Sequence, residues 1–102
     1  MIVRMVRYKV KAERVAENEE LARAVYEELE QGRPAGVRYA TFKLDDGQSF
    51  LHIVALEGAE NPLEQIEAFG RFQRDAVDRC EEPPVFTTLN PVGSFRLLDG
   101  VE

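Results

Sequence analysis

The order of strand and helix patterns is the feature that most constrains the fold of this chain. A β-branched, aromatic-rich pattern over residues 2–10 gives way to apolar residues at three- and four-residue steps from Ala12 to Leu29. Two strand patterns then follow, at residues 37–44 and 49–56, on either side of an Asp-Gly turn. After them come a second helix pattern and a last extended segment. The sequence therefore predicts the order β-α-β-β-α-β.

The sequence defines the first strand and the end of the first helix well, but not the start of that helix. Residues 2–10 carry apolar side chains on both alternating faces, which indicates a central strand covered on both sides. The helix has no good capping residue near Ala12, so its start is indefinite. Gly32 is a typical residue just beyond a helix C-terminus, and Pro34 prevents continuation.

The turn residues of the predicted hairpin at residues 37–56 indicate how its two strands pair. Asp46-Gly47 is a strong signal for a type I′ turn, which needs positive φ at both central residues. Centring the hairpin there places Thr41 opposite His52, with Tyr39 on the same face. The sequence does not specify which face meets the helices. The face opposite His52 is apolar except at its end and consists of Arg38, Ala40, Phe42, Leu44, Leu51, Ile53 and Ala55.

The second helix pattern begins with a good cap. Asn61 suits the N-cap and Pro62 the first helical position, which predicts a helix from there to Cys80. An apolar stripe that includes Val77 would face inward, and Cys80 would be an inert core residue at the helix end. The last segment, residues 85–98, is broken by an Asn-Pro pair, so its second piece would extend the sheet edge or reach a partner subunit.

This order is that of a ferredoxin-like α+β fold, with an antiparallel sheet and two helices on one face. The other face would stay bare, and its apolar area would exceed the roughly 400 Å² that monomers tolerate. We therefore expect a homodimer whose two sheets pack face to face. Residues 1–102 are expected to form a single domain, because this length is near the commonest domain size.

Composition excludes several classes of partner. The net charge of −6 disfavours nucleic acid and anionic membrane surfaces. No apolar run approaches about 18 residues, and residues 1–10 do not resemble a signal peptide. The single cysteine excludes an internal disulfide and fits a reducing cytoplasm. One histidine and one cysteine cannot form a conventional zinc site, so no metal is expected.

The chain resembles the small domains grouped with the antibiotic biosynthesis monooxygenases, in the dimeric α+β barrel superfamily. The likeness spans nearly the whole chain and implies this fold and a homodimer whose two sheets close into an α+β barrel. For some members it also implies oxidation of a small aromatic molecule without metal or flavin, so no cofactor is expected. The residues that carry it are 39–42, 45–47, 50–52, 61–63, 69–73 and 82–84.

The chain departs from this family where catalytic residues are concerned. Characterised oxygenases of the group commonly use a tryptophan and an asparagine near the substrate. This chain has no tryptophan, and Asn61 is better explained as a helix cap. Haem-degrading relatives use a helix histidine, whereas His52 lies in a predicted strand. No catalytic residue is therefore carried over from the resemblance.

His52 is the main candidate for chemistry, because only histidine has an ordinary pKa near neutrality. We hypothesise that His52 deprotonates a phenol-like ligand while Tyr39 and Thr41 position an oxygen atom. The electron-rich carbanion that forms can react with O2 directly. The alternative is a histidine buried for packing, with its hydrogen bonds satisfied by Thr41 or a backbone carbonyl.

Four further residues are candidates for ligand binding. Phe69 and Phe72 lie on the second helix pattern and would stack on a flat molecule, although plain core packing explains them as well. Arg4 and Arg38 lie within strands and would bind an anionic group; the alternative is surface ion pairing.

Two functions therefore remain open. The first is a cofactor-independent, monooxygenase-like homodimer that acts on or binds a small apolar or aromatic molecule. The second is a non-catalytic homodimeric ligand-binding or accessory protein. An open cavity of about 300 Å³ or more that touches His52 and Tyr39 would favour the first.

Overall fold

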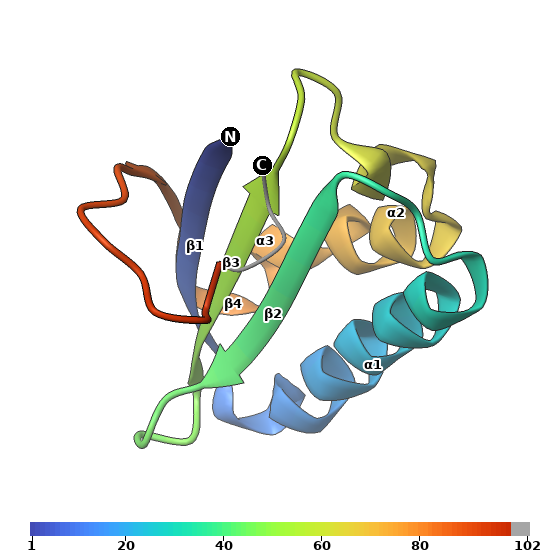
Figure 1. Cartoon of the computed structure of the whole chain (residues 1–102). Coiled ribbons are helices and arrows are strands. Elements are labelled where there is room, and N and C mark those ends of the chain that lie inside the picture. The colour runs from blue at the N-terminus through green and yellow to red at the C-terminus, as the bar shows by residue number, and fades with distance from the viewer. Residues whose placement is uncertain (99–102) are drawn as a thin grey trace.

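The computed structural model describes residues 1–98 and has the predicted ferredoxin-like α+β architecture (Figure 1). Four strands form one antiparallel sheet in the order β2-β3-β1-β4. The helices lie on one face of this sheet (Figure 1). The elements are β1 (Ile2–Val10), η1 (Ala12–Arg14), α1 (Val15–Gly32), β2 (Val37–Lys43), β3 (Ser49–Leu56), η2 (Pro62–Gln65), α2 (Glu67–Arg74), α3 (Ala76–Arg79) and β4 (Cys80–Leu89).

The hairpin has the predicted register but a different turn. Thr41 lies opposite His52, as expected. Gly47 has a φ of 75°, but Asp46 does not have positive φ, so the turn is not type I′. The Asp46 carboxylate instead accepts hydrogen bonds from the backbone N–H groups of Gln48 (2.9 Å) and Ser49 (2.7 Å). Hydrogen bonds from the Ser49 hydroxyl and these amides lower the pKa of Asp46 to about 2.

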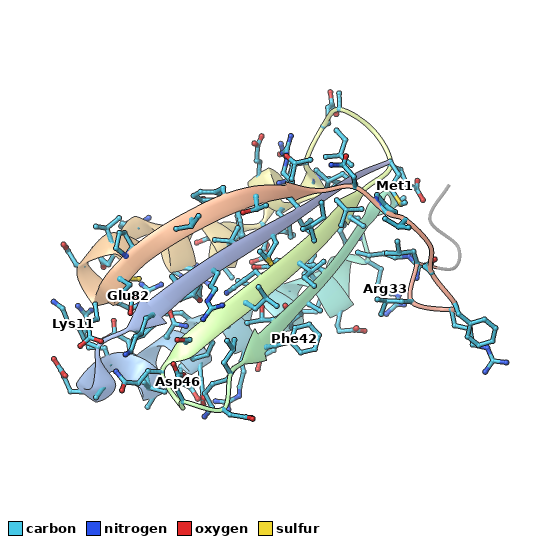
Figure 2. The ribbon with its side chains drawn as sticks, turned by 90° about the vertical axis from the view of Figure 1, so that its left-hand side faces the viewer. Met1, Lys11, Arg33, Phe42, Asp46 and Glu82 are labelled. Carbon is cyan, nitrogen blue, oxygen red and sulfur yellow. The ribbon has the colours of Figure 1, made fainter. Side chains whose placement is uncertain are left out.

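The structure also settles which hairpin face meets the helices. Tyr39 and His52 lie on the helix side of the sheet, with Tyr8 from β1. The opposite face, which we call the bare face, has none of the described helices over it, and Figure 2 looks onto it. Phe42 stands on the bare face with 52% of its surface exposed. β1 is central, as predicted, but helices cover only one of its sides.

The second helix is not continuous, which corrects the prediction. Asn61 caps the segment as expected and accepts a hydrogen bond from the Leu63 N–H at 3.0 Å. At Ile66 the backbone becomes extended (φ −89°, ψ 115°), so a 3-10 turn, α2 and α3 replace one helix. A second interruption at Asp75 (φ −115°, ψ 20°) separates α2 from α3. Val77, in α3, is exposed and not part of the core.

A carboxylate from α1 explains why α2 starts after this break. Glu28 accepts hydrogen bonds from the backbone N–H groups of Glu67 (3.1 Å) and Ala68 (3.0 Å). These are amides of the first helical turn, which otherwise lack partners. A negative charge at this end of a helix is also stabilising. The cap of α2 thus comes from a distant part of the chain, which local patterns do not reveal.

The last strand also differs from expectation. β4 begins at Cys80, which was predicted to end a helix, and it continues through Pro83 and Pro84. Prolines are tolerated because β4 is an edge strand and its pairing with β1 is irregular there. Residues 90–98 form no second strand and lie on the side of the sheet away from the helices (Figure 1).

Candidate functional site

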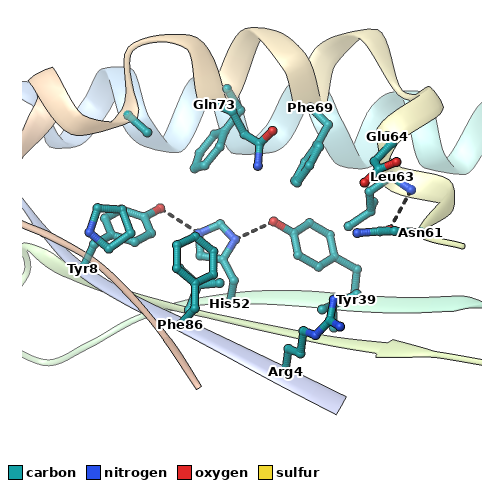
Figure 3. A pocket seen from close by; sticks show the side chains of 15 residues that line it. Arg4, Tyr8, Tyr39, His52, Asn61, Leu63, Glu64, Phe69, Gln73 and Phe86 are labelled. Carbon is teal, nitrogen blue, oxygen red and sulfur yellow. Dashed lines mark hydrogen bonds between the residues drawn. The ribbon is translucent and has the colours of Figure 1, made fainter. Parts of the chain in front are cut away.

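A cavity of about 230 Å³ lies between the sheet and α2. Tyr8, His52 and Tyr39 rise from the sheet toward Phe69 and Gln73 on the helix side (Figure 3). The volume is below the about 300 Å³ at which ligand pockets usually begin. The cavity touches His52 and Tyr39 but is smaller than the size expected for the enzyme-like function, and it would admit only a small ligand of one or two rings.

Both ring nitrogens of His52 are hydrogen-bonded at the wall of this cavity. Nε2 lies 2.6 Å from the Tyr8 hydroxyl, and Nδ1 lies 2.5 Å from the Tyr39 hydroxyl and 3.1 Å from that of Thr41. His52 is only 5% exposed. Burial lowers the pKa of His52 to about 4, so the ring is neutral near pH 7. A ligand in the cavity therefore meets an imidazole whose two nitrogens are already engaged.

Strand register explains why two tyrosines flank one histidine. His52 on β3 pairs with Val6 of β1 on one side and with Thr41 of β2 on the other. Side chains two positions apart on a strand share a face. Tyr8 and Tyr39 are therefore the diagonal neighbours of His52, one on each adjacent strand, and their hydroxyl groups converge on the imidazole.

A second layer of polar groups lies behind Tyr8. Asn18 of α1 donates from Nδ2 to the Tyr8 hydroxyl at 3.0 Å. Arg79 donates from Nε to Asn18 Oδ1 at 3.1 Å and from Nη2 to the Phe72 carbonyl at 2.7 Å. Its guanidinium carbon also lies 4.9 Å from the centre of the Phe72 ring. Arg79 is 1% exposed, and among the described residues no carboxylate forms an ion pair with it.

Aromatic rings complete the surroundings of Tyr39. Tyr26 of α1 stacks on Tyr39 with ring centres 5.4 Å apart, and its hydroxyl lies 2.6 Å from that of Thr41. Phe69 approaches Tyr39 edge-on at 6.3 Å. Burial raises the pKa of both Tyr39 and Tyr8, so both phenols keep their protons near neutral pH. The imidazole and the two phenols at the cavity wall are thus neutral hydrogen-bonding groups set among rings.

The structure brings together most of the residues that the sequence singled out. His52, Tyr39, Phe69, Phe72 and Arg4 all line the cavity. The other two predicted ligand-binding residues do not. Thr41 contacts His52 but does not line the cavity, and Arg38 is exposed on the bare face.

Four residues of the site were not predicted from the sequence. Tyr8 was recoverable, because strand alternation puts it on the same face of β1 as Val6. Tyr26 and Asn18 lie on α1 among residues that read as an ordinary amphipathic helix. Arg79 gave no signal, because an arginine near the end of a predicted helix normally faces solvent.

No group of three or more His, Cys, Asp or Glu side chains among residues 1–98 is arranged to hold a metal ion. None of the helices described there is both long and apolar enough to cross a membrane.

Comparison with known proteins adds evidence about the fold. No family model matches the chain, and no curated protein matches it in sequence. A Nitrosomonas europaea structure provisionally described as an antibiotic biosynthesis monooxygenase superimposes with a TM-score of 0.75 at 18% identity. That match covers 91% of this chain and 100% of the other.

Two other solved structures are similar. SnoaB, a cofactor-independent oxygenase from Streptomyces nogalater, matches with a TM-score of 0.67 at 15% identity, covering 93% of this chain and 96% of its own. A Nitrosomonas europaea protein of unknown function matches with a TM-score of 0.68 at 13% identity, covering 92% and 91%. The chain therefore has the fold of antibiotic biosynthesis monooxygenase structures over about nine-tenths of its length.

Proposed function

We propose that this protein is a small cofactor-independent, monooxygenase-like protein that acts on an aromatic molecule of one or two rings. The observation that carries the proposal is the Tyr39–His52 pair at the wall of an aromatic cavity. The likeness in fold to SnoaB, a cofactor-independent oxygenase, supports the reaction class. Phe69 and Phe72 would stack on the ligand. Arg4, at the cavity wall in Figure 3, would attract an anionic group.

The reaction can be written for 1-naphthol as a representative ligand. One atom of O2 is bonded to a ring carbon to give 1,4-naphthoquinone, and the other leaves as water with two hydrogens lost from the naphthol. The substrate supplies all the electrons, so no further reductant is needed. In this proposal the ligand's oxygen forms a hydrogen bond with the Tyr39 hydroxyl. His52 influences the ligand through its own hydrogen bond to Tyr39.

The test is oxygen consumption by the purified protein with 1-naphthol in the presence of a metal chelator. We expect uptake of O2 with formation of the quinone. Tyr39→Phe and His52→Gln should each lower kcat/KM by about tenfold or more, because each removes a hydrogen bond to the reacting oxygen or to its partner. Arg71→Gln, an exposed change on α2, is the control and should leave the rate unaltered.

Two results would change the proposal. Binding of 1-naphthol without O2 uptake would favour the non-catalytic ligand-binding alternative. Absence of both binding and uptake would overturn an aromatic-ligand function altogether. Wild-type rates in Tyr39→Phe and His52→Gln would remove these residues from the site.

We also propose that two copies associate through their bare faces. Phe42 and Val85 are exposed apolar side chains on this face, and the segment that lies on the same side of the sheet exposes Val92, Phe95 and Leu97. Phe42 and Val85 lie on the two edge strands, so exposed apolar side chains occur at both sides of this face. Isolated apolar side chains are normal at a surface, whereas several large ones on one face are typical of an interface. A two-fold pairing of identical faces would cover all of them.

Sedimentation velocity tests this association. The wild type should sediment as a dimer, and Phe42→Asp should weaken the dimer by at least about tenfold, because a charge would be desolvated without a partner. Val77→Asp introduces the same charge at an exposed apolar position on α3, away from the bare face, and should leave the dimer intact. A monomeric wild type would contradict the proposal.

The setting proposed for this activity is the cytoplasm. Cys80 is a free cysteine, as a reducing compartment allows. The net charge of −6 supports a function without nucleic acid or membrane partners.

A further inference from the structure

We propose that Arg79 and Asn18 are positioning residues that hold the proton of His52 on Nδ1. The Tyr39 hydroxyl then receives this proton in a hydrogen bond and offers its own hydrogen to the ligand. The ligand atom at Tyr39 is therefore an acceptor, namely a carbonyl, phenolate or enolate oxygen. The part about the ligand rests on the function proposed above, whereas the position of the His52 proton does not depend on it.

The first step is the orientation of the Asn18 amide. An arginine side chain has only donors, so the atom that faces Arg79 Nε at 3.1 Å must be the Asn18 oxygen. The amide nitrogen of Asn18 then points to the Tyr8 hydroxyl, 3.0 Å away, as a donor. Asn18 is fully buried, so water does not offer an alternative partner.

The second step is the direction of the Tyr8 hydroxyl. Tyr8 oxygen already accepts from Asn18, and its own hydrogen needs an acceptor, because an unpaired buried donor is costly. Among residues 1–98, the only other hydrogen-bond partner of this hydroxyl is His52 Nε2, at 2.6 Å. Tyr8 therefore donates to Nε2, which must carry a lone pair.

The third step is the position of the hydrogen on the His52 ring. A neutral ring with a lone pair on Nε2 has its hydrogen on Nδ1. Nδ1–H then donates to the Tyr39 hydroxyl at 2.5 Å, with the Thr41 hydroxyl a more distant acceptor at 3.1 Å. In the reverse arrangement, Nε2–H would donate to a Tyr8 oxygen that already accepts from Asn18, and the Tyr8 hydrogen would have no partner.

The consequence lies at Tyr39. Its oxygen accepts from His52, so its remaining hydrogen is the group it can present. Tyr39 lines the cavity, so a ligand oxygen there can accept this hydrogen. A chain of hydrogen bonds that starts at a buried cation therefore ends in a donor at the cavity wall. Such a donor stabilises negative charge on a ligand oxygen.

The first test is the nitrogen NMR spectrum of the imidazole, which is simple to assign because the chain has one histidine. With ¹⁵N-labelled histidine and no ligand, near neutral pH, we expect Nδ1 to be the protonated nitrogen and Nε2 the unprotonated one. A protonated Nε2 in the wild type would overturn the proposal, whatever the variants do.

Asn18→Asp tests the role of the second layer with little change of shape. The carboxylate still accepts from Arg79, but its other oxygen can only accept, so the Tyr8 hydrogen turns toward it. Tyr8 oxygen then accepts from Nε2–H, and we expect the protonated nitrogen to switch from Nδ1 to Nε2. Asn90→Asp makes the same chemical change at an exposed position and is the matched variant in which the wild-type pattern should persist. An unswitched spectrum in folded Asn18→Asp would show that Asn18 does not set the proton.

The prediction that the ligand atom at Tyr39 is an acceptor is tested with 1-tetralone and tetralin. These molecules share a carbon skeleton and differ by one carbonyl oxygen. Calorimetry should show that the wild type binds 1-tetralone about tenfold more tightly, and that Tyr39→Phe and Asn18→Asp lose this preference. Equal affinity in the wild type, or no binding of either, would overturn the assignment. Neither the spectrum nor these affinities requires oxygen consumption, so a failure of the proposed reaction is distinguishable.

Discussion

Replacing Phe72 with alanine should lower the free energy of unfolding by about 3–5 kcal/mol. Phe72 is 7% exposed, and its ring meets three residues of the site: Tyr8 with ring centres 6.5 Å apart, His52 at 5.3 Å, and the Arg79 guanidinium at 4.9 Å. Truncation removes buried apolar surface and leaves a cavity. It also takes away the ring face on which a buried cation rests.

Urea unfolding of matched variants measures this loss. Phe86→Ala makes the same chemical change at a position that is 70% exposed, and it should cost less than about 1 kcal/mol. Both variants remove a ring from the lining of the cavity. A difference in their unfolding free energies therefore reports how deeply each ring is buried, and not whether it lines the cavity. A cost below about 1 kcal/mol for Phe72→Ala would contradict the packing described for it.

Acidification should cost about 3 kcal/mol of stability through His52 alone. Burial lowers its pKa from the ordinary 6.5 to about 4. Between these values the unfolded chain binds a proton that the folded protein does not, so the free energy of unfolding rises with pH. The stabilising effect of a neutral His52 is complete above pH 6.5 and is lost as the pH falls toward 4.

The measurement is the free energy of unfolding of wild type and His52→Gln at several pH values. The upper part of this window isolates His52, because the pKa values of Asp46, Glu17 and Glu19 are lowered and these carboxylates act only at more acidic pH. Wild-type stability should fall from pH 6.5 to about 5, and the variant should show a much smaller slope there. Parallel curves would mean that His52 titrates normally in the folded state.

Local sequence patterns were enough to predict the fold and part of the site. Strand alternation and a turn centred on Asp46-Gly47 determine that Thr41 faces His52, because the side-chain period of a strand is two residues. That register alone placed His52 beside Tyr39. The exact turn did not matter for this outcome, because the four-residue loop that forms keeps the same pairing.

The parts that could not be predicted depend on contacts between distant segments. Arg79 is buried because Asn18 and the Phe72 carbonyl accept its hydrogen bonds, and neither is recognisable as a partner from local periodicity. The break before α2 has the same origin, since Glu28 caps it from another helix. The end of α1 was also predicted one residue too early. Gly32 is the last residue of the helix, and Arg33 takes the left-handed position after it, with a φ of 41°.

The Glu28 cap connects the two walls of the site through a single helix. The same helix, α1, supplies both Asn18, which orients the Tyr8 hydroxyl below the cavity, and Glu28, which anchors the start of α2 above it. α2 in turn carries Phe69 and Phe72. The position of one helix therefore bears on both walls of the cavity, on the Tyr8 hydroxyl through Asn18 and on the start of α2 through Glu28.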